Sequence, residues 1–177
     1  VAGRDPLADS YLAASLRDDF ANLTIEAESL VSAYTHLHAP GSVSARVLDR
    51  SGWVDANLVS MRTMLDPLLD RFGRNIARSP IAPVTRRIAA GEVGALLGYM
   101  AQRVLGQYDL LVPDDAGDAV YYVGGNILAL EKRFAFRPRD FRLWIAIHEV
   151  THRMQFTGVP WMRDYFLGLV HRALGLV

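Results

Sequence analysis

Apolar residues recur three and four positions apart over most of the chain, with charged and polar residues between them. This spacing places the apolar side chains on one face of an α-helix and predicts amphipathic helices that pack on a core. Proline and glycine separate the stretches, because proline interrupts a helix and glycine relaxes the backbone. The pattern predicts helices over residues 10–38 (as one long or two short helices), 51–72, 83–105, 138–158 and 161–177.

Two short apolar runs in the second half of the chain break this helical pattern. Residues 119–123 and 127–130 are rich in aliphatic residues and tyrosine, and they predict two β-strands. The Gly-Gly-Asn segment at 124–126 can form a turn or bulge between them, and residues 107–119 predict a loop. We therefore expect a mainly α fold of the α+β class, with a small β element next to the helix at 138–158.

Length and composition indicate one globular domain over residues 1–177. Hydrophobic residues make up 51% of the chain and charged residues 21%, a balance typical of folded proteins. Lys plus Arg and Asp plus Glu both number 19, so no basic excess is available to neutralise the phosphates of a nucleic acid. The longest apolar stretches, 88–101 and 161–177, are broken by charged residues, which argues against a membrane span.

The chain contains no cysteine, which excludes disulfides, thiolate metal ligands and cysteine nucleophiles and fits a reducing compartment. Its first residues lack the basic start and apolar core of a signal peptide. We therefore expect a cytoplasmic protein. Because the chain begins with Val1 rather than Met, we also expect that it has been trimmed.

Candidate chemistry concentrates in the segment His148-Glu149-Val150-Thr151-His152 of the fourth predicted helix. Two histidines four residues apart emerge from one helix face about one turn apart, so both imidazoles can bind one metal ion. Glu149 lies beside them, where it can accept the proton of a metal-bound water. Imidazole ligands, the absence of thiols and a hydrolysis without redox change favour Zn²⁺.

Two neighbouring stripes run along this predicted helix. One is apolar and is expected to pack on the core: Leu143, Ile147, Val150 and Met154. The other is expected to face a site: Trp144, His148, His152 and Gln155.

Two residues are candidates for the third protein ligand of the metal. Glu149 is the last glutamate of the chain, and the position six residues after the second motif histidine is glycine, so two common arrangements are excluded. Asp164 and His171 remain, twelve and nineteen residues after His152 and on one face of the last predicted helix. We favour His171, because its separation leaves room for a turn and a second helix that crosses the first. Asp164 is the alternative ligand, or an acceptor that orients a ligating imidazole, and a ligand outside the 177 residues is a further alternative.

These positions predict metal-assisted hydrolysis of a peptide or protein substrate. The metal, held by His148, His152 and a third group, would lower the pKa of a bound water, and Glu149 would act as general base and pass the proton to the leaving amine. The strand before the helix can align an extended peptide by adding it as a further strand. Spacing singles out no residue to stabilise the oxyanion; the candidates are Tyr121, Tyr122, Arg153 and Tyr165.

Four segments are distinctive as a set: 98–109 (GYMAQRVLGQYD), 138–144 (PRDFRLW), 148–152 (HEVTH) and 155–161 (QFTGVPW). Together they resemble a bacterial family of zincin-like metallopeptidases, labelled hydrolases or zinc-dependent metalloproteases, one branch of which is named for the biosynthesis of a deazaflavin coenzyme. The resemblance runs from about residue 52 to the C-terminus. It implies a zincin-type fold, zinc at His148 and His152, and Glu149 as catalytic base.

The family name rests on the motif more than on a known substrate, so the resemblance adds little about what is cleaved. Its members tend to be longer than 177 residues, which favours a fragment of a longer chain. A competing hypothesis is a non-catalytic zinc-binding or scaffold protein associated with coenzyme biosynthesis. Glu149 favours the enzyme, because a purely structural site with two histidines needs no acid at that position.

Overall fold

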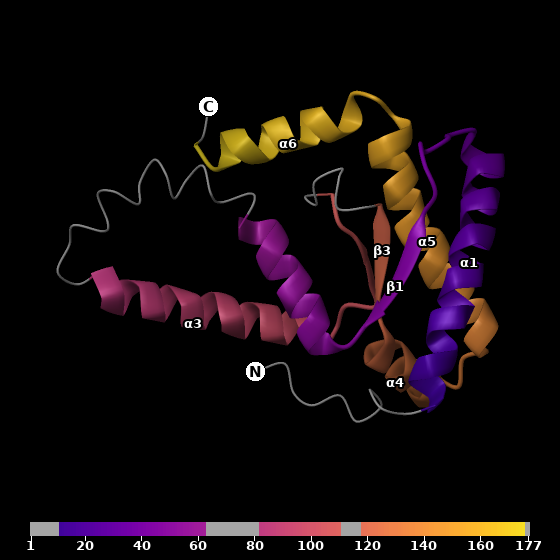
Figure 1. Ribbon diagram of the computed structural model, residues 1–177, viewed down its shortest axis with the longest axis horizontal. Coiled ribbons are helices and arrows are strands. Elements are labelled where there is room, and N and C mark those ends of the chain that lie inside the picture. The colour runs from indigo at the N-terminus through magenta and orange to yellow at the C-terminus, as the bar shows by residue number, and fades with distance from the viewer. Residues whose placement is uncertain (1–10, 63–81, 111–117, 176–177) are drawn as a thin grey trace.

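The computed structural model describes residues 11–62, 82–110 and 118–175. Within these ranges the chain is mainly helical, with a small sheet of three strands (Figure 1). The helices are α1 (Tyr11–Thr35), a helix over residues 50–62, α3 (Ala82–Ala101), α4 (Gly124–Phe134), α5 (Pro138–Gly158) and α6 (Met162–Ala173). The strands are β1 (Ser44–Leu48), β2 (Gly106–Tyr108) and β3 (Ala119–Val123). This architecture confirms the predicted fold class.

The sheet has the strand order β1-β3-β2, with β3 in the centre. β1 runs parallel to β3, from Ser44 opposite Ala119 to Leu48 opposite Val123. β2 runs antiparallel to β3, with Gln107 opposite Tyr121. All five residues of β3 are buried, because the strand is paired on both sides and covered by helices.

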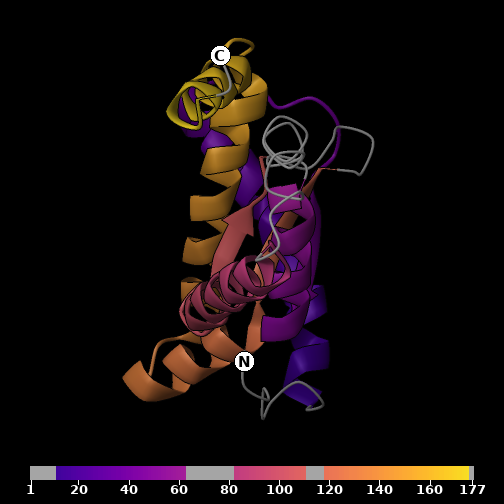
Figure 2. The same cartoon turned by 90° about the vertical axis from the view of Figure 1, so that its left-hand side faces the viewer.

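The main core lies where α1 and α5 pack side by side on the sheet (Figure 1). Phe20 of α1 stacks on Tyr122 of β3 with ring centroids 3.9 Å apart, and the buried Tyr122 hydroxyl bonds Thr24 Oγ1 at 2.8 Å. Figures 1 and 2 show that α3 and α6 project from the same side of this core. The packing therefore leaves α5 covered by α1 on one side and open on another.

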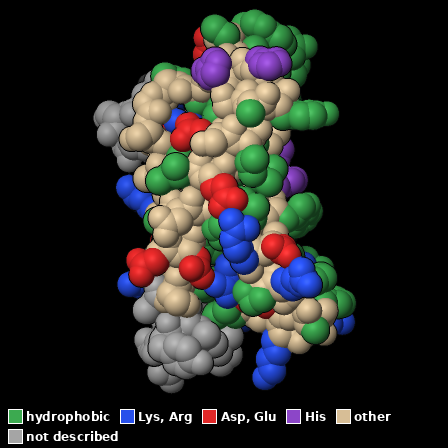
Figure 3. Space-filling model, turned by 90° about the vertical axis from the view of Figure 1, so that its right-hand side faces the viewer, with side chains coloured by type: hydrophobic (Ala, Val, Ile, Leu, Met, Phe, Trp, Pro, Cys, Tyr) green, Lys and Arg blue, Asp and Glu red, His purple; other side chains and the backbone are tan. Residues whose placement is uncertain are grey.

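Two buried arginines of α5 join it to the elements around it. Arg142 forms a two-bond pair with Glu131 of α4, at 2.7 Å for each bond, and also pairs with Asp19 of α1. Arg153 is fully buried and pairs with Glu28 of α1 at 2.7 Å. On the face seen in Figure 3, acidic and basic side chains are mixed rather than separated.

The predicted strand at 127–130 is wrong, because these residues lie in α4, which begins directly after β3. A short apolar run has the same appearance in a strand and in a buried helix, and here the helix forms. Glycine at position 124 allows the first turn of α4 to pack this closely. A Cβ at this position would lie 3.0 Å from Val47 and 3.1 Å from Leu16, so a larger residue would push these side chains away. The helix can therefore begin against the sheet and α1.

Other predicted boundaries also need correction. β1 was not predicted, and the predicted loop at 107–119 contains the end of β2 and the start of β3. The second predicted helix is confirmed over residues 51–62, and its remainder, 63–72, lies outside the described residues. In the part of the chain that the structure describes, no helix combines the length and apolarity needed to cross a bilayer.

Candidate metal centre

α5 carries the His-Glu-Val-Thr-His segment over its middle turns. Pro138 is its first residue, where the missing N–H is not needed, and Asp140 lies in the first turn, where a carboxylate is favourable to the helix dipole. The predicted apolar stripe is only partly buried, since two of its four residues lie in the core and the other two are half-buried against it. Val150 and Met154 are buried in the core, whereas Trp144 is 59% exposed on the neighbouring stripe.

His148 and His152 lie together on the open side of α5. Their ring centroids are 4.8 Å apart and their planes are nearly perpendicular, at 89°. The Nδ1 atom of His152 lies 3.3 Å from Gln155 Oε1, within reach of a hydrogen bond that would orient the ring. The predicted pair is therefore brought together, with both imidazoles next to solvent-accessible space.

Two shallow pockets meet at His148. One, of about 200 Å³, is lined by Leu105, Gly106, Trp144, Ile145, His148 and Glu149. The other, of about 300 Å³, is lined by Trp144, Ile147, His148, Thr151, His152 and Gln155. A ligand in either pocket would contact the exposed face of His148.

Glu149 is packed between α5 and β2 and also lines the first of these pockets. Its side chain is buried, and the backbone N–H of Tyr108 donates a hydrogen bond to its Oε2 at 3.2 Å. Burial raises the pKa of Glu149 to about 7, and the bond from Tyr108 opposes this rise. The carboxyl group can therefore take up and release a proton near neutral pH.

Gly106 of β2 makes this position of Glu149 possible. A Cβ at residue 106 would lie 2.6 Å from Glu149 Cγ and 2.8 Å from its Oε1, closer than two such atoms can approach. Sequence reasoning missed this role, because one glycine at the end of a predicted helix gives no sign of the distant residue that approaches it. The structure thus adds Gly106 and Tyr108 to the site.

β2 is an edge strand among the described strands. The N–H of Tyr108 points away from β3 toward Glu149. Alternate residues of a strand direct their backbone groups to the same side, so the N–H and C=O of Gly106 also face this outer edge. The edge therefore presents backbone hydrogen-bonding groups at the pocket that His148 and Glu149 line.

A row of aromatic rings leads from the end of α4 to the histidines. Successive ring centroids lie between 4.7 and 6.2 Å apart, and Trp144 is 6.0 Å from His148. Several of these rings are exposed, which is unusual for large apolar side chains gathered in one place. The row consists of Phe134, Phe136, Phe141, Trp144, His148 and His152.

The donor atoms present fit a metal such as zinc only in part. Two imidazoles one helical turn apart are the donor type that zinc accepts, and no thiol is present in the chain. Within the described ranges, however, no group of three His, Asp or Glu side chains forms a metal-binding cluster. Asp164 and His171 both lie on α6, the first exposed and the second half-buried, and neither joins the pair in such a cluster.

Three of the four oxyanion candidates are buried. Tyr122 bonds Thr24, and Arg153 is enclosed by its partners on α1 and before β3. Tyr121 is also buried, and burial raises the pKa of its phenol. Tyr165 of α6 is 56% exposed.

The chain is similar to proteins of one family over almost its whole length. The family model for zincin-like metallopeptidases matches residues 1–176. The crystal structure of "a putative hydrolase with a novel fold" from Chloroflexus aurantiacus is 32% identical, with a TM-score of 0.78. The match covers 99% of this chain and 56% of that chain, so the chain spans little more than half the length of that relative. No curated protein matches. The chain therefore belongs to the zincin-like metallopeptidase family.

Proposed function

We propose that the protein is a zinc-dependent hydrolase of peptide bonds. The observation that carries this proposal is the pairing of His148 and His152, whose ring centroids are 4.8 Å apart, together with the buried carboxyl group of Glu149 at a pocket that His148 also lines. A structural helix would need neither two neighbouring imidazoles, one exposed and one half-buried, nor a buried acid beside them. Membership of the family supports the same chemistry.

His148 and His152 would hold the metal through their ring nitrogens. When bound, zinc supplies a Lewis acid that activates water and polarises the substrate carbonyl. The third protein ligand is proposed to be His171, with Asp164 as the alternative. Both lie on α6, which packs on α5 through Phe166 against Phe156, with ring centroids 5.4 Å apart.

Glu149 would act as the general base and then as the general acid. Its pKa of about 7 suits both roles, because such a group accepts a proton from water and returns it to a leaving amine at neutral pH. The bond from Tyr108 and the absence of a side chain at Gly106 hold the carboxyl group at the pocket. β2 therefore positions the base.

The substrate would be an extended peptide or protein segment. Such a segment can add to the outer edge of β2, where the backbone groups of Gly106 face away from β3. Trp144 and the aromatic row would then bind apolar side chains beside the cleaved bond. We therefore expect a preference for peptides with an apolar residue next to that bond.

Hydrolysis of a peptide library tests the proposal. The wild type loaded with zinc should cleave peptides, and Glu149→Gln should lose activity by about a thousandfold or more while retaining zinc. Glu92→Gln, an exposed glutamate of α3, is the matched control and should cleave at the wild-type rate. Zinc retention without cleavage by the wild type would instead indicate a non-catalytic zinc-binding or scaffold protein.

A further inference from the structure

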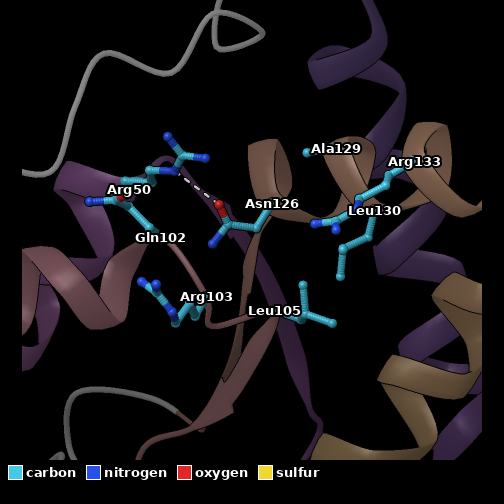
Figure 4. Close-up of a pocket in the computed structure, with 8 residues that line it drawn as sticks. All are labelled: Arg50, Gln102, Arg103, Leu105, Asn126, Ala129, Leu130 and Arg133. Atoms are coloured by element: carbon cyan, nitrogen blue, oxygen red, sulfur yellow. Dashed lines mark hydrogen bonds between the residues drawn. The ribbon is translucent and has the colours of Figure 1, made fainter.

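A cavity of about 410 Å³ lies on the other side of Leu105 from the pocket of His148 and Glu149. The face of α4 forms one wall, and residues at the end of α3 and the start of the helix at 50–62 form the opposite one (Figure 4). It is lined by Arg50, Gln102, Arg103, Leu105, Asn126, Ala129, Leu130 and Arg133.

The lining is strongly basic although the chain as a whole is neutral. Arg50, Arg103 and Arg133 contribute three positive charges, and the lining residues that the structure describes include no carboxylate. In the described part of the chain, the arginines that form ion pairs are Arg137, Arg139, Arg142 and Arg153. The three cavity arginines have no acidic partner among the described residues. Three such arginines around one cavity are expected to attract an anion.

Two of the three arginines are held in place by neutral contacts. Arg50 Nε donates to Asn126 Oδ1 at 2.9 Å, and Asn126 Nδ2 donates to the carbonyls of Ala101 and Val104. The guanidinium of Arg103 lies 3.6 Å from the centre of the Tyr99 ring. Asn126 is buried, so the floor of the cavity is fixed before a ligand enters.

Figure 4 shows that the lining side chains come from two opposite sides of the cavity. The Arg133 side chain extends from α4 toward Asn126, while Arg50, Gln102 and Arg103 lie on the opposite side. Leu105, Ala129 and Leu130 add an apolar portion to the lining. The cavity can therefore contact an anionic group and a small organic body at the same time.

We propose that this cavity binds a small phosphorylated organic molecule. Planar guanidinium groups form paired hydrogen bonds with phosphate oxygens, and three of them supply enough positive charge to neutralise a phosphate monoester or a diphosphate. The volume lies in the range of pockets for small molecules. The proposal concerns binding alone and does not depend on zinc or on catalysis at His148.

Titration of the full chain with inorganic pyrophosphate, phenyl phosphate and citrate tests the proposal. A double variant, Arg103→Gln with Arg133→Gln, removes two charges from the cavity. The matched control, Arg87→Gln with Arg172→Gln, removes the same charge from exposed positions. Arg87 lies fifteen residues before Gln102 along the chain, which corresponds to roughly 22 Å of helix.

We expect the wild type and the control to bind pyrophosphate and phenyl phosphate, and the cavity variant to bind both at least about tenfold more weakly. In the wild type, backbone amide signals of Gln102 and Asn126 should shift on addition of phenyl phosphate. Equal affinity in all three proteins, equal loss in both variants, or no shift at these amides would overturn the proposal. Equally tight binding of citrate would overturn the assignment to phosphate.

Discussion

Glu149 is held at the site by groups that are distant in the sequence. Its carboxyl group is buried, receives a hydrogen bond from the N–H of Tyr108 and fills the space that a side chain at residue 106 would occupy. The motif predicts the residue type and its closeness to His148 and His152, since these follow from helix geometry. It contains no information on β2, because the pairing of a three-residue strand with β3 depends on tertiary contacts.

The burial of Glu149 predicts a pH-dependent stability in the metal-free chain. Its pKa rises from 4.5 to about 7 on folding, so between these values the folded state binds more protons than the unfolded state. Stability is therefore expected to fall as pH rises through this window. Glu149→Gln removes the ionisation, and thermal unfolding with zinc chelated should show a larger gain in Tm at about pH 8 than at about pH 5.

Glu92→Gln, an exposed position on α3, provides the control for this measurement. Its effect on Tm should be small at both pH values. An equal change in Tm for Glu149→Gln at both pH values would contradict the assigned cause.

Gly106→Ala should damage both stability and the site. The added methyl group would lie within 3.0 Å of Glu149, which must move and leave the N–H of Tyr108 without this acceptor. We expect a loss of about 1–3 kcal/mol in the free energy of unfolding. Gly91→Ala in α3 meets nothing within 4 Å and should instead stabilise the helix by up to about 1 kcal/mol. Denaturant unfolding of both variants distinguishes these effects, and equal stability of the two would refute the close approach.

At the scale of elements, α5 is fixed by buried ion pairs as well as by apolar packing. Arg142 joins it to α4 and α1, and its side chain has an exposed fraction of only 9%. Arg142→Met would leave Glu131 buried without this partner and should cost about 3–5 kcal/mol in unfolding free energy.

Arg139 provides the comparison within the same helix. It pairs with Glu26 of α1 at 3.0 Å, but its side chain is 66% exposed. Arg139→Met should therefore cost no more than about 1 kcal/mol. Urea unfolding measures the free energy of unfolding of both variants, Arg142→Met and Arg139→Met. Similar losses in the two would show that burial does not set the strength of these ion pairs.

The aromatic row on α5 makes a prediction about substrate preference. Trp144→Ala should lower kcat/KM by about tenfold for peptides with an apolar residue beside the cleaved bond, and less for polar ones. Trp161→Ala is the matched control, since both tryptophans are about equally exposed, at 59% and 60%. A uniform decrease for all peptides, or the same change in the control, would exclude Trp144 from side-chain recognition.

The element pattern was predictable where helices are long and amphipathic. α1, α3, α5 and α6 follow the predicted stretches closely, because a period of three to four residues repeated over several turns is distinctive. The strands were harder to predict from the sequence. β3 was predicted from its apolar residues, whereas β1 alternates exposed and half-buried positions and β2 has only three residues. The prediction of a strand at 127–130 failed because a short buried apolar run has the same appearance in a helix and in a strand.

At the scale of the whole molecule, the family expected from the motifs is confirmed, and the ligand set is the part that remains proposed. The described residues bring two imidazoles together but no third carboxylate or imidazole. His171 was favoured from its spacing, yet spacing does not fix how α6 is placed relative to α5. The association with a coenzyme branch and the cytoplasmic location likewise stay predictions.

Zinc stoichiometry in three proteins tests the central claim most directly. The wild type, a double variant His148→Ala with His152→Ala, and a control His36→Ala with His38→Ala at the end of α1 would be loaded with zinc and dialysed before metal analysis. The wild type and control should each hold about one zinc ion per chain, and the double variant close to none. Zinc retained in the double variant, or absent from the wild type, would contradict a metal centre at His148 and His152.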